Sequence, residues 1–422
     1  MTNNYTIGID FGNTYSCVSV LMNNNVEIIP NQQGNRTTHT CISFSENEKF
    51  VGDNAYNLSS SNPLNTVFDL KRLFFNEYSS SFFQSCLKKW PFKVVKKETQ
   101  NKNKNENENE NKNEEEEVGI EIEVEYQNEK QIIPIESLIT QYFEKLKEIA
   151  SMHLLTDIKD AIITVPVYYN ETQIKRIKKI VTRAGLNLKT IIYEPIAALL
   201  AYGFEKSNNK KILIVDIGGS DTTFSLYAIK DYVFKKLSHS FNGNVGGTNF
   251  DEKLLDYCAG SFTKQNRSID ASRFKSSSRS MSRIKKACQR AKRVLSYSNR
   301  ATIEIDSLFE GIDYYENIGR SKFYELCAEY FQQIKNLLHE SVNQSGLEKS
   351  EIDEVILVGG ASRIPRIQEI ISQYFDNKEL CRSINPDEAI AYGASARNVL
   401  FLKNEELGSE NVVDHGIDIE FL

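Results

Sequence analysis

Apolar and polar residues recur with regular spacing along this chain. Seven apolar residues from Ile135 to Ile149 return every three or four positions, and seven more from Phe323 to Leu338 do the same. Each set predicts a helix with one buried face. Shorter segments predict strands at 161–165, 189–193 and 354–358 and a further helix at 170–184. Because helices and strands alternate through much of the chain, we expect an α/β fold.

Two strand-and-turn patterns, roughly two hundred residues apart, share one design. In residues 5–20 an apolar strand ends at Asp10, and in residues 212–226 another ends at Asp216. Each continues through glycine and small hydroxyl residues, which let the turn amides approach a bulky anion. An aspartate at the strand end is well placed to hold Mg2+ through water. The repetition predicts a duplicated domain that closes on one nucleotide from both sides.

The chain contains no P-loop, and no Gly-x-Gly-x-x-Gly stands at a strand-to-helix turn. Hairpin turns would therefore make the phosphate contacts. A single Asp-x-Gly turn is weak evidence, because ordinary turns often use those residues. Two copies, together with a third apolar strand that ends in Gly359-Gly360-Ala361-Ser362-Arg363, favour a nucleotide site over turn chemistry.

One segment, residues 99–117, contains no apolar residue and consists largely of Asn, Lys and Glu. Such a segment cannot offset the entropy of its own ordering, so we predict a disordered insertion. The alternative interpretation is a docking segment. Residues 121–126 alternate like a half-buried strand, so the insertion interrupts a domain.

Composition and charge exclude several classes of protein. The net charge of −6 gives no general affinity for nucleic acid or anionic membranes. The basic run 267–300 has few interleaved aromatic residues, which argues against nucleic-acid binding. The seven cysteines are spread without a Cys-x-x-Cys pair, which argues against structural zinc and fits a reducing compartment. With no signal peptide and no apolar run of about 20 residues, we expect a cytoplasmic protein that does not span a membrane.

A family resemblance rests on several strings that extend from Tyr5 to Leu402. They are Ile-Gly-Ile-Asp-Phe-Gly-Asn-Thr-Tyr-Ser-Cys (7–17), Gln-Gly-Asn-Arg-Thr-Thr (33–38), Asn-Thr-Val-Phe-Asp-Leu-Lys-Arg-Leu (65–73), Ile-Thr-Val-Pro-Val-Tyr-Tyr-Asn (163–170), Glu-Pro-Ile-Ala-Ala (194–198), Ile-Leu-Val-Gly-Gly-Ala-Ser-Arg-Ile-Pro (356–365) and Ile-Asn-Pro-Asp-Glu-Ala (384–389). Together they resemble the nucleotide-binding domain of the seventy-kilodalton heat-shock chaperones (DnaK type).

The resemblance implies an actin-like ATPase fold, with two duplicated ribonuclease H-like lobes around a nucleotide cleft. Lobe I would cover residues 1–207, with its outer subdomain IB at about 40–134. Lobe II would cover residues 208–404, with its outer subdomain IIB at about 248–327. Residues 405–422 would form a C-terminal tail too short to build a peptide-binding domain.

The resemblance also implies roles for individual residues, with ATP and Mg2+ as cofactors. Asp10 and Asp216 would face the metal, and Lys71 and Glu194 would join Asp10 in catalysis by placing the attacking water. The nucleotide would be bound by Gly12, Asn13, Thr14, Tyr15, Gly218, Gly219, Gly246, Gly247, Lys292, Arg293, Ser296, Gly359, Gly360, Arg363 and Asp387.

The chain departs from the family pattern at the second phosphate turn. The family's threonine there is Asp221 and its aspartate is Thr223. If both belong to one strand, they share a face about 6–7 Å apart, so Asp221 would lie near the γ-phosphate. At 4 Å and an effective dielectric of about 20, two unit charges repel by about 4 kcal/mol. Gln289 replaces a glutamate near the ribose, and Ile174 replaces an arginine that links the lobes to the peptide-binding domain.

Three functions remain open from the sequence. The leading hypothesis is a cytosolic ATP-binding regulatory or partner subunit in protein folding, with weak or absent hydrolysis. The alternatives are a fully active ATPase coupled to a partner in trans, and a binding module that has lost the nucleotide. The resemblance implies a J-domain protein, a nucleotide-exchange factor or the ribosome as partner, and argues against a sugar kinase or an actin-like polymer.

Overall fold

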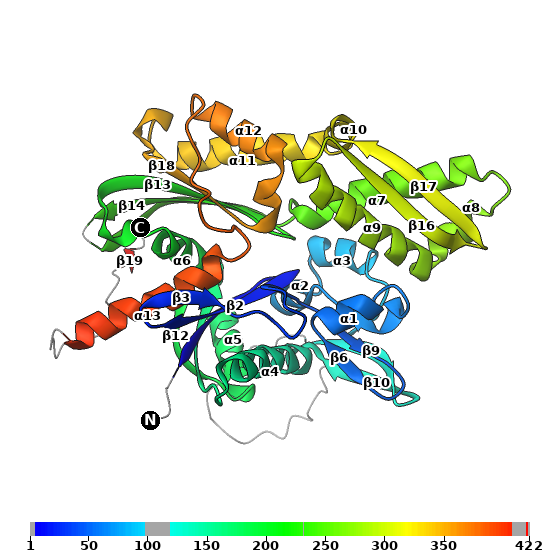
Figure 1. Cartoon of the computed structure of the whole chain (residues 1–422), viewed down its shortest axis with the longest axis horizontal. Helices are drawn as coiled ribbons and strands as arrows, with labels where there is room; N and C mark the ends of the chain where they lie inside the picture. The colour runs from blue at the N-terminus through cyan, green and yellow to red at the C-terminus, as the bar shows by residue number, and fades with distance from the viewer. Residues whose placement is uncertain (1–4, 98–118, 231, 407–418, 421–422) are drawn as a thin grey trace, which may run out of the picture.

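The computed structural model describes residues 5–97, 119–230, 232–406 and 419–420, with the side chains of 208, 398–406 and 419–420 left aside. The predicted insertion at 99–117 and most of the tail at 405–422 lie outside the described residues. Two large sheets form the upper and lower halves of the molecule (Figure 1), and smaller α/β parts stand beside each of them. Within this described part, no helix is both long and apolar enough to cross a membrane.

The first sheet carries the strand that ends near Asp10. Its strands are β1 (Thr6–Phe11), β2 (Tyr15–Met22), β3 (Asn25–Ile28), β4 (Thr38–His39), β11 (Asp160–Val165) and β12 (Asn187–Tyr193), in the order β12-β11-β1-β2-β3 with β4 on β2. Helices α4 (Ile135–Leu154) and α5 (Glu171–Arg183) contribute to its core. All seven apolar residues predicted for the helix face between Ile135 and Ile149 are buried there, which confirms that prediction.

The second sheet repeats this arrangement. Its strands are β13 (Asn208–Ile217), β14 (Thr222–Lys230), β15 (Val233–Asn242), β18 (Glu354–Val358) and β19 (Ile419–Glu420), in the order β18-β13-β14-β15-β19. Like β1 between β2 and β11, β13 lies between an antiparallel partner, β14, and a parallel one, β18. The predicted duplication is thus present.

Helices α10 (Arg320–Leu326), α11 (Ala328–Ser345) and α12 (Pro365–Tyr374) pack on the second sheet's side of the molecule. The single helix predicted over Phe323–Leu338 is wrong in one respect, because it is interrupted at Cys327. Cys327 has φ −102° and ψ 10°, and its N–H bonds to Phe323 and Glu325 in a tightened final turn. The spacing of apolar residues cannot reveal this break in the helix, because the buried face continues from one helix to the next.

The outer parts of the lobes face each other on the right of Figure 1. The first lobe contributes α1 (Asp53–Leu58), α2 (Leu70–Phe75), α3 (Ser81–Leu87), β5 (Ile42–Phe44), β6 (Lys49–Val51), β7 (Thr66–Val67), β8 (Lys93–Lys96), β9 (Ile120–Tyr126) and β10 (Glu129–Pro134). The second contributes α7 (Gly247–Gln265), α8 (Ala271–Ser276), α9 (Ser278–Tyr297), β16 (Arg300–Phe309) and β17 (Ile312–Gly319). Short 3-10 helices lie at Pro63–Asn65, Phe204–Lys206, Lys349–Glu351 and Gly360–Arg363.

Two helices join the lobes at the centre of the molecule. Helix α6 (Glu194–Ala201) and helix α13 (Ala389–Glu406) lie between the two sheets in Figure 1 and share one hydrophobic cluster with strands of both. A Cβ on Gly393 of α13 would lie 1.7 Å from the carbonyl oxygen of Ala197 in α6. The backbones of the two helices can therefore touch only because position 393 is glycine.

We expect Gly393→Ala to lower the free energy of unfolding by about 3 kcal/mol or more, because its methyl group has no space and the helices must separate. Urea unfolding measures this. Gly260→Ala is the matched control, because no atom lies within 4 Å of the added Cβ in the middle of α7. That change should stabilise the protein by about 0.5–1 kcal/mol. Equal effects of the two changes would contradict the helix contact.

Candidate functional site

The two predicted phosphate turns occupy equivalent places in the two sheets. In the first hairpin Phe11 pairs with Ser16, which leaves residues 12–15 as the turn. In the second, Ile217 pairs with Thr222, which leaves residues 218–221. The turns face each other closely, because a Cβ on Gly219 would lie 2.0 Å from Thr14 Oγ1. The turns of the two strand-and-turn copies, about two hundred residues apart in the sequence, thus border one central site.

Three of the predicted catalytic residues come together at the end of β1. Lys71, from α2, places its Nζ 2.9 Å from Oε1 of Glu194, the first residue of α6. Thr164 Oγ1 donates to Asp10 Oδ1 at 3.3 Å. Burial and the charge of Glu194 raise the pKa of Asp10 to about 7. Burial alone would lower the pKa of Lys71, but the charge of Glu194 and its neighbours raises it, so Lys71 remains protonated.

Asp216 and Asp221 bring further negative charge to this centre. Asp216 lies one residue before the end of β13, opposite Thr223, and its pKa is raised by burial and then by the charges of Glu194 and Asp221. The Tyr168 hydroxyl donates to Asp221 Oδ2 at 3.1 Å. Asp221 lies in the turn just before β14, so the sequence argument that placed it on a strand face is wrong in its geometry. Its carboxylate nevertheless lies close enough to raise the pKa of Asp10 and Glu194.

These residues fit a magnesium–nucleotide group. Partial burial raises the pKa values of Asp10, Glu194 and Asp216, so the site favours an added positive charge. Thr14 Oγ1, on the first turn, is buried without a hydrogen-bond partner. Among the residues that the structure describes, no group of three or more His, Cys, Asp or Glu side chains could hold a metal ion.

We expect the affinity for ADP·Mg2+ to fall as the pH drops below about 7. The pKa of Asp10 in the free protein is raised to about 7, and its proton must leave before the carboxylate can help hold the ion. Each proton released can weaken the apparent affinity by up to about tenfold per pH unit. Calorimetric titrations between about pH 5.5 and 8 measure the slope. The dependence of the affinity on pH should be weaker in Asp10→Asn. An affinity that does not change with pH in the unmodified protein would contradict a role for the Asp10 carboxylate in holding the ion.

The same pKa shift has the opposite consequence for the stability of the free protein. A carboxyl whose pKa rises on folding binds more protons in the folded chain than in the unfolded chain, here between about pH 4 and 7. Its contribution to stability is therefore lost as the pH rises through this window. Thermal unfolding should show Asp10→Asn gaining stability relative to the unmodified protein between about pH 5 and 8.

The residues predicted near the ribose and base lie around α7 and α9. Lys292 Nζ donates to the Gly247 carbonyl at 2.6 Å and to Asp251 Oδ2 at 2.8 Å, so it points toward α7. Gly246 packs against the second turn, where a Cβ would lie 2.6 Å from the Asp221 nitrogen. Arg293 donates to the Tyr15 hydroxyl across the cleft. Ser296 Oγ reaches only the Lys292 carbonyl, one helical turn back, at 3.4 Å.

The remaining predicted residues border the second aspartate strand. Gly359 has φ 78°, and a Cβ there would lie 2.5 Å from Asp216 Oδ1. Gly360 lies against Asp387, since its Cβ would be 2.3 Å from Asp387 Oδ1. Arg363 Nε donates to Asp387 Oδ2 at 3.2 Å. The two glycines therefore allow a loop to approach both carboxylates closely.

Sequence reasoning missed two residues of the site, Arg72 and Tyr168, and did not predict the contacts of Asn13. Arg72, the neighbour of Lys71, donates to the Ser220 carbonyl at 2.5 Å and to the Gly243 carbonyl at 3.1 Å, so it joins α2 to the second turn. Asn13 is buried and donates to Asp69 Oδ1 at 2.8 Å, while it accepts from the Arg72 N–H. The string that contains Lys71 was the available signal for Arg72. No local pattern indicated that Tyr168 would contact Asp221.

Two related sheets, each with an aspartate one residue before the end of a central strand at one shared site, define an actin-like ATPase fold, which confirms the predicted class. The chain belongs to the Hsp70 family, because the family model described as Hsp70 protein matches residues 6–413. The match confirms the resemblance to the family's nucleotide-binding domain.

Individual relatives agree with this assignment. Heat shock cognate 70 kDa protein 3 of Dictyostelium discoideum is 40% identical over 396 residues, which are 93% of this chain and 60% of that protein. Heat shock 70 kDa protein of Neurospora crassa is 39% identical over 393 residues, which are 93% of this chain and 57% of that protein. The chain therefore spans only about three fifths of the length of these relatives.

Proposed function

We propose that this chain binds ATP·Mg2+ between its lobes, hydrolyses it slowly or not at all, and acts in cytosolic protein folding as a regulatory or partner subunit. Family membership supports the chaperone-like ATP-binding part of the proposal. The observation that carries the slow hydrolysis is the carboxylate of Asp221, which stands among the catalytic residues where the family has a threonine.

The physical argument concerns charge near the transferred phosphoryl group. Asp10, Glu194, Asp216 and Asp221 influence one another electrostatically, whereas Lys71 is the cation that acts on all of them. Phosphoryl transfer needs neutralisation of charge that spreads over the γ-phosphate oxygens. An additional carboxylate opposes this neutralisation. Two unit negative charges 4 Å apart repel by about 4 kcal/mol at an effective dielectric of about 20. Burial raises the pKa of Tyr168, which keeps its hydroxyl available to hold Asp221 in place.

Single-turnover hydrolysis of ATP by the purified full chain tests the proposal. We expect a rate at least tenfold below that of an ordinary Hsp70 nucleotide-binding domain under the same conditions. Calorimetry with ATP and ADP should show binding at micromolar concentration or tighter. An ordinary rate would refute slow hydrolysis, and absent binding would leave only the alternative of a module that has lost the nucleotide.

A fully active ATPase coupled to a partner in trans is the second candidate. It is favoured by the assembled Lys71–Glu194 pair beside Asp10, which gives the chain a complete set of predicted catalytic groups. For partners, we propose a J-domain protein, a nucleotide-exchange factor or the ribosome. Ile174 packs against the first lobe's core, where the family has an arginine that links the lobes to the peptide-binding domain. The loss of this charge supports altered coupling between the lobes and such a domain. Pull-down of each candidate with the ATP-loaded and ADP-loaded chain tests these partners.

A further inference from the structure

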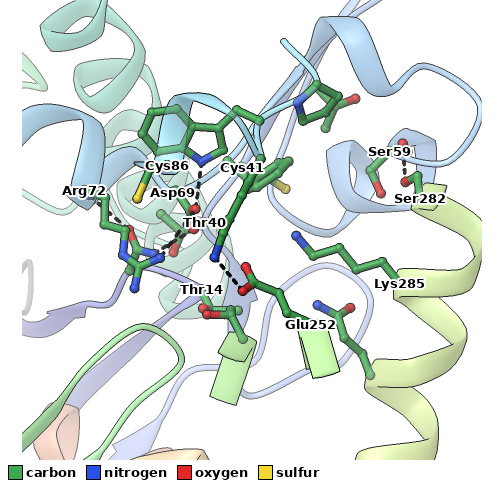
Figure 2. A pocket seen from close by; sticks show the side chains of 18 of the residues that line it. Thr14, Thr40, Cys41, Ser59, Asp69, Arg72, Cys86, Glu252, Ser282 and Lys285 are labelled. Atoms are coloured by element: carbon green, nitrogen blue, oxygen red, sulfur yellow. Dashed lines mark hydrogen bonds and ion pairs between the residues drawn. The ribbon is translucent and has the colours of Figure 1, made fainter. Parts of the chain in front are cut away.

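A cavity lies between the outer parts of the two lobes, beside the first phosphate turn (Figure 2). Its volume is about 120 Å3, which is close to that of an internal cavity able to hold one aromatic ring. The first lobe contributes the rings of Phe68, Phe82 and Trp90, and helices α7 and α9 contribute Thr248, Glu252 and Lys285. Of the residues predicted to bind nucleotide, only Asn13 and Thr14 line this cavity.

Contacts between the lobes close the space. Ser282 Oγ donates to the Ser59 carbonyl at 2.9 Å, an interaction that Figure 2 shows at one side of the cavity. Tyr56 donates to Gln289 Oε1 at 2.5 Å. On another wall, Lys89 and Glu252 form an ion pair of 2.7 Å. The cavity therefore exists only when both lobes are together, so a molecule inside it would contact both.

The lining contains polar atoms that have no partner. Thr248 Oγ1 and His39 Nε2 are buried without a hydrogen bond, although both residues line the cavity. Burying such an atom unpaired is unfavourable, so these atoms indicate a polar occupant. His39 Nδ1 lies 2.6 Å from Asp53 Oδ1. Burial lowers the pKa of His39, so the ring is neutral with its proton toward Asp53, and Nε2 accepts.

The lining also contains a cation that is available to a ligand. Lys285 extends from α9 toward the cavity in Figure 2, with its Nζ 4.7 Å from the centre of the Phe68 ring. It forms no ion pair with any residue in the described part of the chain. The other lysines and the arginine of the lining are engaged: Lys89 pairs with Glu252, Lys286 donates to the Asn57 carbonyl, and Arg72 donates to the Ser220 carbonyl. An anionic group would therefore be held best beside Lys285.

We propose that this cavity binds a small aromatic acid of one ring that also carries a hydrogen-bond donor. The acid group pairs with Lys285, the ring packs among Phe68, Phe82 and Trp90, and the donor reaches His39 Nε2 or Thr248 Oγ1. Since the ligand contacts both lobes beside Thr14, it holds the cleft closed and slows nucleotide release. This last consequence rests on the proposed nucleotide binding, whereas the site itself does not.

Titration of the nucleotide-free full chain with 4-hydroxybenzoate tests the site directly. We expect a dissociation constant of about 1 mM or tighter by ligand-observed NMR or calorimetry, as is usual for a molecule of about ten heavy atoms. Lys285→Gln should weaken binding at least tenfold, whereas Lys335→Gln, a change of an exposed lysine on α11, should leave it unchanged. Phe82→Leu removes part of the aromatic wall and should also weaken binding.

Two matched probes separate the contribution of the ligand's hydrogen-bond donor from that of its negative charge. Benzoate lacks the donor and 4-hydroxybenzamide lacks the charge, so both should bind more weakly, and the amide should be insensitive to Lys285→Gln. Absence of binding by 4-hydroxybenzoate, or binding that Lys285→Gln does not change, overturns the proposal. Competitive displacement by ATP·Mg2+ also overturns it, because the acid would then occupy the nucleotide site. Slower release of a fluorescent ADP analogue at saturating 4-hydroxybenzoate tests the coupling separately, and by reciprocity the affinity for 4-hydroxybenzoate should be higher with ADP bound.

Discussion

Exchanging Asp221 for threonine and Thr223 for aspartate should raise the single-turnover rate of ATP hydrolysis by about a hundredfold. The change removes a carboxylate from the turn where we propose that the γ-phosphate binds, and it restores one on β14, directly opposite Asp216. The full repulsion of about 4 kcal/mol corresponds to almost a thousandfold in rate. We expect less because Mg2+ neutralises part of the charge. Rapid-quench measurements with the enzyme in excess over ATP give the chemical step without product release.

The two single variants separate the effects of removing and restoring charge. Asp221→Thr alone should produce a partial rise in rate, because the repulsion is relieved without a carboxylate opposite Asp216. Thr223→Asp alone should produce no rise, because it adds negative charge to a site that already has raised pKa values at Asp10 and Asp216. ADP affinity and thermal midpoint serve as folding controls. An unchanged rate in the double variant would support the active-ATPase alternative, because Asp221 would then not limit catalysis.

Lys71→Met should abolish measurable hydrolysis and lower the free energy of unfolding by about 3–5 kcal/mol at pH 8. The side chains of Lys71 and Glu194 are 12% and 14% exposed, so removal of the ammonium leaves a carboxylate without its partner in a buried site. Burial raises the pKa of Glu194 even in the presence of Lys71. Glu194 can therefore take up a proton at lower pH, and the loss of stability should be smaller at about pH 5 than at pH 8. Urea unfolding at both pH values measures this difference.

The double variant Lys71→Met with Glu194→Gln is the control for this prediction. It removes both charges, so it should recover most of the stability lost in Lys71→Met while remaining inactive. If Lys71→Met costs less than about 1 kcal/mol at pH 8, the ion pair is hydrated like a surface pair, and its proposed role inside the closed site is wrong.

The sequence by itself determined the fold class and the approximate positions of the main strands, to within one or two residues at their ends. Apolar period and length identify the helix that begins at Ile135 and the strand at 354–358, because a buried face gives a regular spacing of apolar residues in the local sequence. Asp10 and Asp216 were recognisable for a related reason. Each follows an apolar strand and precedes a turn with glycine, and few residues other than glycine let the turn backbone approach a ligand so closely. The matched strings then supplied the family.

Only the tertiary structure decided which of these residues act on one another. Lys71 and Glu194 are 123 positions apart, and Tyr168 and Asp221 are 53 apart, so no local period relates them. The position of Asp221 in the turn, instead of on the strand, changed the geometry of the predicted repulsion. The cavity beside Lys285 was invisible to sequence reasoning because its walls come from both lobes. Strand ends and turns depend on neighbouring residues, whereas paired charges and cavities depend on how distant elements pack.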